Sequence, residues 1–206
     1  MVARFDPDAA ALLVRYALGC ADDLVKERKM DPKAAEDLKR KVFENRPATE
    51  ADAQKFAVAY LKCSSLARRM GKSSIDVGIV RAYFFIPSEH SAFVDAVFKA
   101  DTASGVKWGF EPSECKLQEG TVVKVGRGSA VVRAFIDGKG TEKMCRNPLS
   151  HLKGGEAVVF HRGYVVEELS VELRAVIDRL RNSDAENTAL LKGALIRGEK
   201  KARIKS

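Results

Sequence analysis

Five short, β-favouring segments separated by glycine turns fill residues 115–169 of this 206-residue chain, and they constrain the fold more than any other feature. The turns are Gly126-Arg127-Gly128, Asp137-Gly138-Lys139-Gly140 and Lys153-Gly154-Gly155, and Gly163 bends the last stretch. Glycine supplies the positive φ that tight hairpins need. Because short strands leave edges that other chains can pair with, we expect the sheet to close on itself. The stretch therefore predicts a small, five-stranded, OB-like β-barrel.

The residues before the barrel are typical of helices. Apolar residues recur at helical spacing, Asp6-Pro7 and Asp31-Pro32 are helix-start pairs, and Thr49 with Asp52 resembles a capping box. Residues 75–86 are apolar enough for a buried strand, but Asp76 can cap a helix and no partner strand is evident. We predict a helix there.

The fold class predicted is α+β, a helical bundle followed by the barrel and by C-terminal helices. After the barrel, Ser170 is expected to cap one helix and Asp184 to begin a second. The predicted divisions are a helical domain (1–104), a linker (105–114), the barrel (115–169), C-terminal helices (170–197) and a basic tail (198–206).

Composition bounds the function. The chain is 46% hydrophobic and 31% charged, which suits a globular core, and it has no apolar run of the roughly 20 residues that span a bilayer. No signal-peptide pattern opens the sequence, and the four cysteines are widely spaced with no C-x-x-C, so we expect reduced thiols and a cytoplasmic location. There is no P-loop, dinucleotide fingerprint or paired-carboxylate motif, and we do not expect a recognisable enzyme.

One part of the barrel resembles a known family. Cys115-x-x-x-x-Gly120, the β-branched residues and glycine turn that follow, and the run from Gly155 to Tyr164 are similar to the small hydrogenase-maturation chaperones of the HypC/HupF type. The resemblance implies that Cys115 and His161 hold a metal, iron or else zinc. In that family the cysteine is the chain terminus, whereas Cys115 is internal, so any role of a free amine is lost.

The helical half adds a second resemblance. Arg15 to Cys20 and Val80 to Tyr83, followed by a barrel with a cysteine and a histidine, look like an uncharacterised family that fuses a helical region to a HypC-like module. This implies an architecture and no activity.

Each site residue also has a structural interpretation. Cys115 is either a thiolate ligand, with a pKa lowered by the neighbouring Lys116, or a small buried residue. His161 is either the second ligand or a hydrogen-bonded structural histidine. Cys145 is a candidate third thiol near the barrel site, and Gly120 and Gly163 are candidate site positions beside the two ligands. For the other cysteines and histidines we expect structural roles. Cys20 and Cys63 should lie in the helical core, and His90 and His151 should be exposed to solvent or cap helices.

The function predicted is a HypC-like adaptor or chaperone that holds a metal fragment, or docks on a metalloenzyme precursor, through Cys115 and His161. The rival prediction is a non-catalytic module for protein or nucleic acid with a degenerate barrel site. The net charge of +8 gathers partly in the tail, which is either a solvated end or, in this rival prediction, a contact to nucleic acid through Lys200, Lys201, Arg203 and Lys205. The barrel has few of the aromatic residues on which nucleic-acid bases stack, and this counts against nucleic-acid binding. A thiol-dependent activity of Cys115 is a third alternative.

Overall fold

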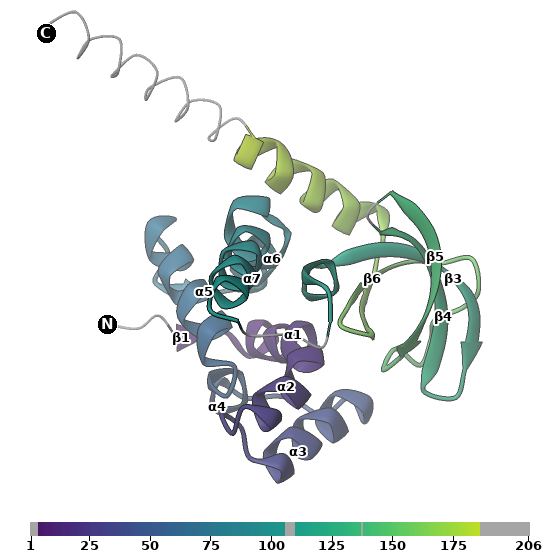
Figure 1. Ribbon diagram of the computed structural model, residues 1–206, viewed down its shortest axis with the longest axis horizontal. Helices are drawn as coiled ribbons and strands as arrows, with labels where there is room; N and C mark the ends of the chain where they lie inside the picture. The colour runs from purple at the N-terminus through teal and green to yellow at the C-terminus, as the bar shows by residue number, and fades with distance from the viewer. Residues whose placement is uncertain (1–3, 106–109, 137, 186–206) are drawn as a thin grey trace, which may run out of the picture.

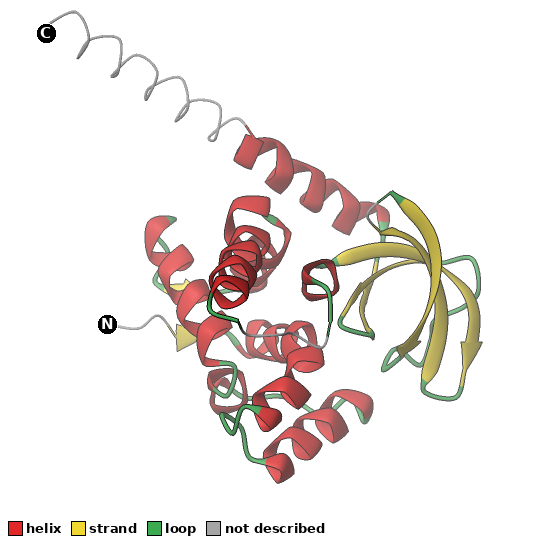
Figure 2. Ribbon diagram, viewed as in Figure 1, coloured by secondary structure: helices red, strands yellow, loops and turns green. Residues whose placement is uncertain are grey.

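The computed structural model describes residues 4–105, 110–136 and 138–185 of the chain. A helical part, a closed β-barrel and a last helix follow one another, and the α+β prediction is confirmed. Figure 1 shows the barrel on one side of the helical part, with the last helix (residues 171–185) leading away from it. Figure 2 shows the same separation of helices from strands.

The helical part contains β1 (Arg4–Phe5), α1 (Pro7–Ala17), η1 (Leu18–Cys20), α2 (Ala21–Lys26), α3 (Pro32–Phe43), α4 (Glu50–Gln54), α5 (Ala57–Arg69), β2 (Ser74–Ile75), α6 (Val77–Phe85), η2 (Pro87–Ser91) and α7 (Ala92–Ala103). The barrel part contains η3 (Pro112–Cys115), β3 (Gln118–Gly126), β4 (Ser129–Ile136), β5 (Lys139–Arg146), β6 (Ala157–His161) and β7 (Tyr164–Glu168).

Three predicted helix starts form as the side chains indicate. Asp31 accepts hydrogen bonds from the first backbone amides of α3, and Thr49 and Asp52 form the capping box of α4. Asp76 accepts from the amide of Ile79 at 2.9 Å, so the ambiguous stretch is a helix, α6. Each cap satisfies amides that the first turn of a helix leaves unpaired.

Several helix boundaries differ from the sequence prediction. The 3₁₀ turn η1 interrupts the first helix at Gly19, a position where the sequence indicates a break. The single helix expected from Thr49 to about Met70 is instead divided into α4 and α5. Ser74 and Ile75 pair in parallel with β1, a partner 70 residues away that local pattern does not indicate. Ser170 caps the last helix by accepting from the amide of Leu173 at 3.2 Å, but this helix continues through Asp184, which the sequence predicted as a new start.

The strands close in the order β3-β4-β5-β7-β6, with β6 pairing back onto β3. Numbered from the first strand of the barrel this is 1-2-3-5-4, the order of an OB-like barrel. Neighbouring strands are antiparallel except β5 and β7, which pair in parallel where Arg146 faces Tyr164. The five-stranded barrel predicted from the glycine turns is therefore confirmed.

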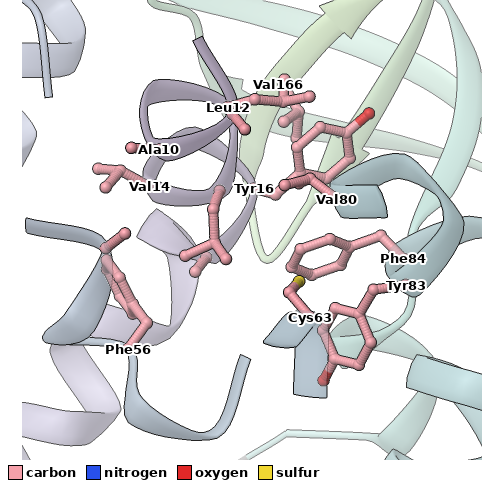
Figure 3. Packing of buried hydrophobic residues seen from close by; sticks show 14 of the residues in the cluster. Ala10, Leu12, Val14, Tyr16, Phe56, Cys63, Val80, Tyr83, Phe84 and Val166 are labelled. Carbon is pink, nitrogen blue, oxygen red and sulfur yellow. The ribbon is translucent and has the colours of Figure 1, made fainter. Parts of the chain in front are cut away.

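Two hydrophobic clusters hold the molecule together. One fills the barrel, around Val132, Val158 and Val165. The other joins the helices to the outer wall of β6 and β7 and to the last helix, through Val159, Val166 and Ile177. Figure 3 shows Tyr16 of α1 in this second cluster between Val166 of β7 and Phe84 of α6.

A partly buried charge network crosses the same junction. Glu167 of β7 accepts a hydrogen bond from the hydroxyl of Tyr16 and forms a two-point ion pair with Arg81 of α6, at 2.7 Å and 3.3 Å. Such bidentate pairs fix geometry as well as contributing energy. Packing and charge together fix the barrel against α1 and α6.

Over the residues that the structure describes, no helix combines the length and the apolar character needed to cross a membrane.

Candidate functional site

His161 is the last residue of β6 and lies between two backbone segments of the chain. Its side chain is buried, with 1% of the residue exposed. The Nδ1 atom lies 2.6 Å from the carbonyl oxygen of Tyr16, at the end of α1, and the Nε2 atom lies 2.9 Å from the carbonyl oxygen of Cys115. Both ring nitrogens are thus directed at backbone acceptors.

The charge state of His161 decides how these contacts work. A neutral imidazole has one N–H and donates to one of the two carbonyls, whereas the imidazolium donates to both. Burial lowers the pKa of His161, the two carbonyls act in the opposite direction by favouring the charged form, and the net direction is downward. In this arrangement neither nitrogen offers a free lone pair to a guest. Ligation by His161 stays a prediction, and it requires the ring to leave one of these carbonyls.

Cys115 lies just before the barrel. It ends the 3₁₀ turn η3, and the first barrel strand begins only at Gln118, so the predicted strand start at Cys115 is wrong. Its thiol is partly exposed. Burial raises the pKa of Cys115 to about 11. The predicted lowering by Lys116 is therefore wrong, because the ammonium of Lys116 pairs with Asp95 at 2.7 Å.

Cys115 and His161 both line one pocket at the junction of the helices and the barrel. The pocket has a volume of about 420 Å³, and its walls come from α1, η1, α2, α5, α6, η2, α7 and η3 of the chain before the barrel and from β6 of the barrel. Aromatic rings dominate the walls, among them Phe56, Phe84, Phe93 and Phe110. The two residues that the sequence selected do share an opening with room for a guest.

Two further residues of this pocket escaped the sequence prediction. Cys20, expected in the core, is partly exposed and lines the pocket. His90, expected at solvent or as a cap, is buried with 7% exposed, and its Nδ1 atom has no hydrogen-bond partner in the described part of the chain. Burial lowers the pKa of His90 to about 3, so the ring is neutral at physiological pH. Cys63 does lie in the helical core, as predicted.

The turn between β6 and β7 brings the barrel to Cys20. Arg162 and Gly163 both have positive φ, at 51° and 76°, as a two-residue hairpin turn requires. A Cβ at Gly19 would lie 2.3 Å from the Cβ of Arg162, so only glycine allows this close approach to η1. The guanidinium of Arg162 pairs with Asp23 and stacks 3.4 Å from the ring centre of Phe110.

The other predicted site residues lie elsewhere. Cys145 is buried in the barrel interior and does not line the pocket. Gly120 is a packing position, since a Cβ there would lie 2.5 Å from a methyl group of Val132. His151 is exposed, 3.4 Å from Glu168. Lys200, Lys201, Arg203 and Lys205 lie outside the described residues.

No protein-family model matches this chain, and no curated protein matches it either. The helices and the closed barrel are compatible with a helical region fused to a barrel, and the comparisons add no family to that architecture.

The pocket is better suited to binding than to catalysis. Nucleophilic cysteines need a lowered pKa and an adjacent base, whereas the pKa of Cys115 is raised and His161 faces its carbonyl oxygen rather than its sulfur. Within the described residues no three His, Cys, Asp or Glu side chains are placed to hold a metal ion together. A guest bound by protein ligands alone would therefore be held at few points.

Proposed function

We propose that the protein is a non-catalytic, HypC-like adaptor that carries a metal fragment in the junction pocket, held by Cys115, and delivers it to a metalloenzyme precursor. The observation that supports this most is that Cys115 and His161, chosen from the sequence alone, line the same pocket of about 420 Å³. The barrel order adds to it, since an OB-like barrel of this size suits the resemblance.

The protein supplies soft donors and leaves room for other ligands. A thiolate is a ligand of iron, zinc and copper. Because only a small number of protein ligands would hold the metal, a partner protein could remove it. The apolar walls exclude water from a guest that brings its own small ligands. In this proposal His161 positions Cys115, by holding its carbonyl oxygen, and becomes a ligand only if the ring moves.

Metal analysis after anaerobic purification tests the proposal. The full chain is produced in an iron-replete host, and iron and zinc are measured per chain for the wild type, Cys115→Ala and the control Cys63→Ala, whose thiol lies in the helical core. We expect the wild type and the control to retain metal and Cys115→Ala to lose at least about fivefold. Equal metal in Cys115→Ala and the wild type would contradict the proposal.

A second candidate function is protein binding by the outer wall of the barrel. Phe135 on β4 is 76% exposed and Met144 on β5 is 70% exposed, and the ion pair of Arg133 with Glu142 lies between their positions in the strand register, so each is a separate apolar contact point for another protein. Of the barrel's other aromatic residues noted from the sequence, Phe160 and Tyr164 are buried, so stacking of nucleic-acid bases is less well supported. An oligonucleotide-binding assay separates the two kinds of partner. Salt-sensitive binding that Phe135→Ala weakens would mean that the barrel wall binds nucleic acid, whereas no binding would leave a protein as the partner.

A further inference from the structure

Cys20 and Cys115 come from opposite sides of the junction to one pocket. Cys20 ends the 3₁₀ turn η1 of the helical part, and Cys115 ends η3 just before the barrel. Both side chains line the junction pocket. The close approach of Gly19 to Arg162 fixes this relation, because the backbone next to Cys20 is in contact with the turn that follows His161.

The same two charged residues, Arg162 and Asp23, affect the pKa of both thiols. Burial raises the pKa of Cys20 to about 12, and Cys115 is the next cause of that rise. Arg162 acts to lower the pKa of both thiols, and Asp23 acts to raise both. Asp23, which pairs with Arg162, lines the same pocket as the two cysteines.

Most other side chains at the pocket that could donate to a metal already have partners within the protein. His161 directs both nitrogens at carbonyl oxygens, and Asp23 is bound by Arg162. His90 also lines the pocket, and its buried Nδ1 atom has no hydrogen-bond partner in the described part of the chain. No group of three candidate ligands is present among residues 4–105, 110–136 and 138–185.

We propose that Cys20 and Cys115 together bind a soft, thiophilic metal ion of low coordination number, for which Cu(I) is the representative. Two thiolates complete the preferred linear coordination of such an ion, whereas zinc in protein sites takes four ligands. The inference rests on the proposed function, because it assigns the second protein ligand and the metal class of the same pocket.

The binding step involves no electron transfer. Each thiol loses its proton to solvent, two sulfur–metal bonds form, and the ion keeps its oxidation state. Two thiolates on a monovalent cation leave one negative charge in the pocket. The guanidinium of Arg162 favours negative charge on both sulfurs, and its ion pair with Asp23 opposes that effect in part.

The test is an anaerobic titration of the reduced full chain with Cu(I), in competition with a chromogenic Cu(I) chelator. We expect one Cu(I) per chain, with the ultraviolet absorption of a thiolate–copper bond. Cys20→Ala and Cys115→Ala should each weaken binding by at least about 100-fold, while the controls Cys63→Ala and Cys145→Ala, both at fully buried positions outside the pocket, should bind as the wild type does.

A second measurement on the wild type avoids the risk that a variant fails to fold. Bound Cu(I) should protect Cys20 and Cys115, and not the other cysteines, from alkylation by a maleimide, as mapped by mass spectrometry. Unprotected Cys20, or Cys20→Ala that binds Cu(I) as tightly as the wild type, overturns the inference. If iron retention still depends on Cys115 in that case, the proposed function survives although the inference fails. If both thiols bind Cu(I) but the purified protein retains no iron, the inference survives and the proposed function fails.

Discussion

The Nδ1 atom of His161 lies 2.6 Å from the carbonyl oxygen of Tyr16, which is 145 residues earlier in the chain. A barrel side chain therefore contacts the last turn of α1, while its Nε2 atom lies 2.9 Å from the carbonyl oxygen of Cys115. This histidine joins the helical part, the segment before the barrel and the barrel itself. While both nitrogens face these carbonyl oxygens, the ring has this structural role and not that of a metal ligand.

Replacing His161 tests that structural role. In His161→Leu, the carbonyl oxygen that accepts the single N–H of the neutral imidazole loses its donor, and the free energy of unfolding should fall by about 1 to 3 kcal/mol. The matched control is His151→Leu, since His151 is exposed and should change stability by less than about 0.5 kcal/mol. Urea denaturation measures both. Equal stabilities of the two variants would mean that the contacts of His161 contribute little.

Glu167 is predicted to matter far more than its neighbour Glu168. Glu167→Ala leaves Arg81 partly buried without its partner and removes the acceptor of the Tyr16 hydroxyl, which should cost about 2 to 4 kcal/mol. Glu168 pairs only with the exposed His151 among the described residues, so Glu168→Ala should cost less than about 0.5 kcal/mol. Thermal or urea unfolding of the two variants in the same buffer measures both losses of stability. Similar losses for Glu167→Ala and Glu168→Ala would mean that the network of Glu167 contributes little.

Acid should destabilise the protein partly through His90. The unfolded chain binds this proton near pH 6.5 and the folded chain only near pH 3, so between these values the unfolded state holds more protons and stability falls as the pH falls. The slope is about 1.4 kcal/mol per pH unit. From pH 7 to pH 5 the wild type should therefore lose about 2 kcal/mol more than His90→Phe, which keeps an aromatic ring beside Tyr83 and Phe84. An identical pH dependence of both proteins in urea unfolding would refute this.

Cys115 should react slowly with alkylating agents. Burial raises its pKa to about 11, so at neutral pH the thiolate fraction is small, and alkylation should be at least about tenfold slower than that of a free cysteine peptide. Mass spectrometry of the peptide that contains Cys115 gives the rate. A rate faster than that of the free peptide would revive a thiol-dependent enzyme, which the sequence left open.

The barrel was predictable because its signals are local. Gly128 and Gly138 have positive φ in the structure, and buried and exposed residues alternate along β4 between these turns. The caps at Asp31 and Asp76 are local too, since each side chain bonds amides two or three residues ahead. Such features need no knowledge of the rest of the chain.

The composition of the site was not predictable in the same way. Cys20 was read as a core residue because its helical neighbours are apolar, and only the insertion of Arg162 against Gly19 makes it a pocket residue. His90 became buried through the rings of Tyr83 and Phe84, and Ser74–Ile75 became a strand through distant pairing with β1. These outcomes depend on tertiary contacts. The one signal that pointed towards Cys20 was its glycine neighbour, which marks a close approach of backbones.

X-ray absorption at the metal edge of the anaerobically purified protein tests most directly whether Cys115 holds a guest in the junction pocket. The account predicts sulfur in the first coordination shell of the wild type and of Cys63→Ala, and a loss of that sulfur signal in Cys115→Ala. A first shell made of oxygen and nitrogen alone, or a sulfur signal unchanged by Cys115→Ala, would contradict it.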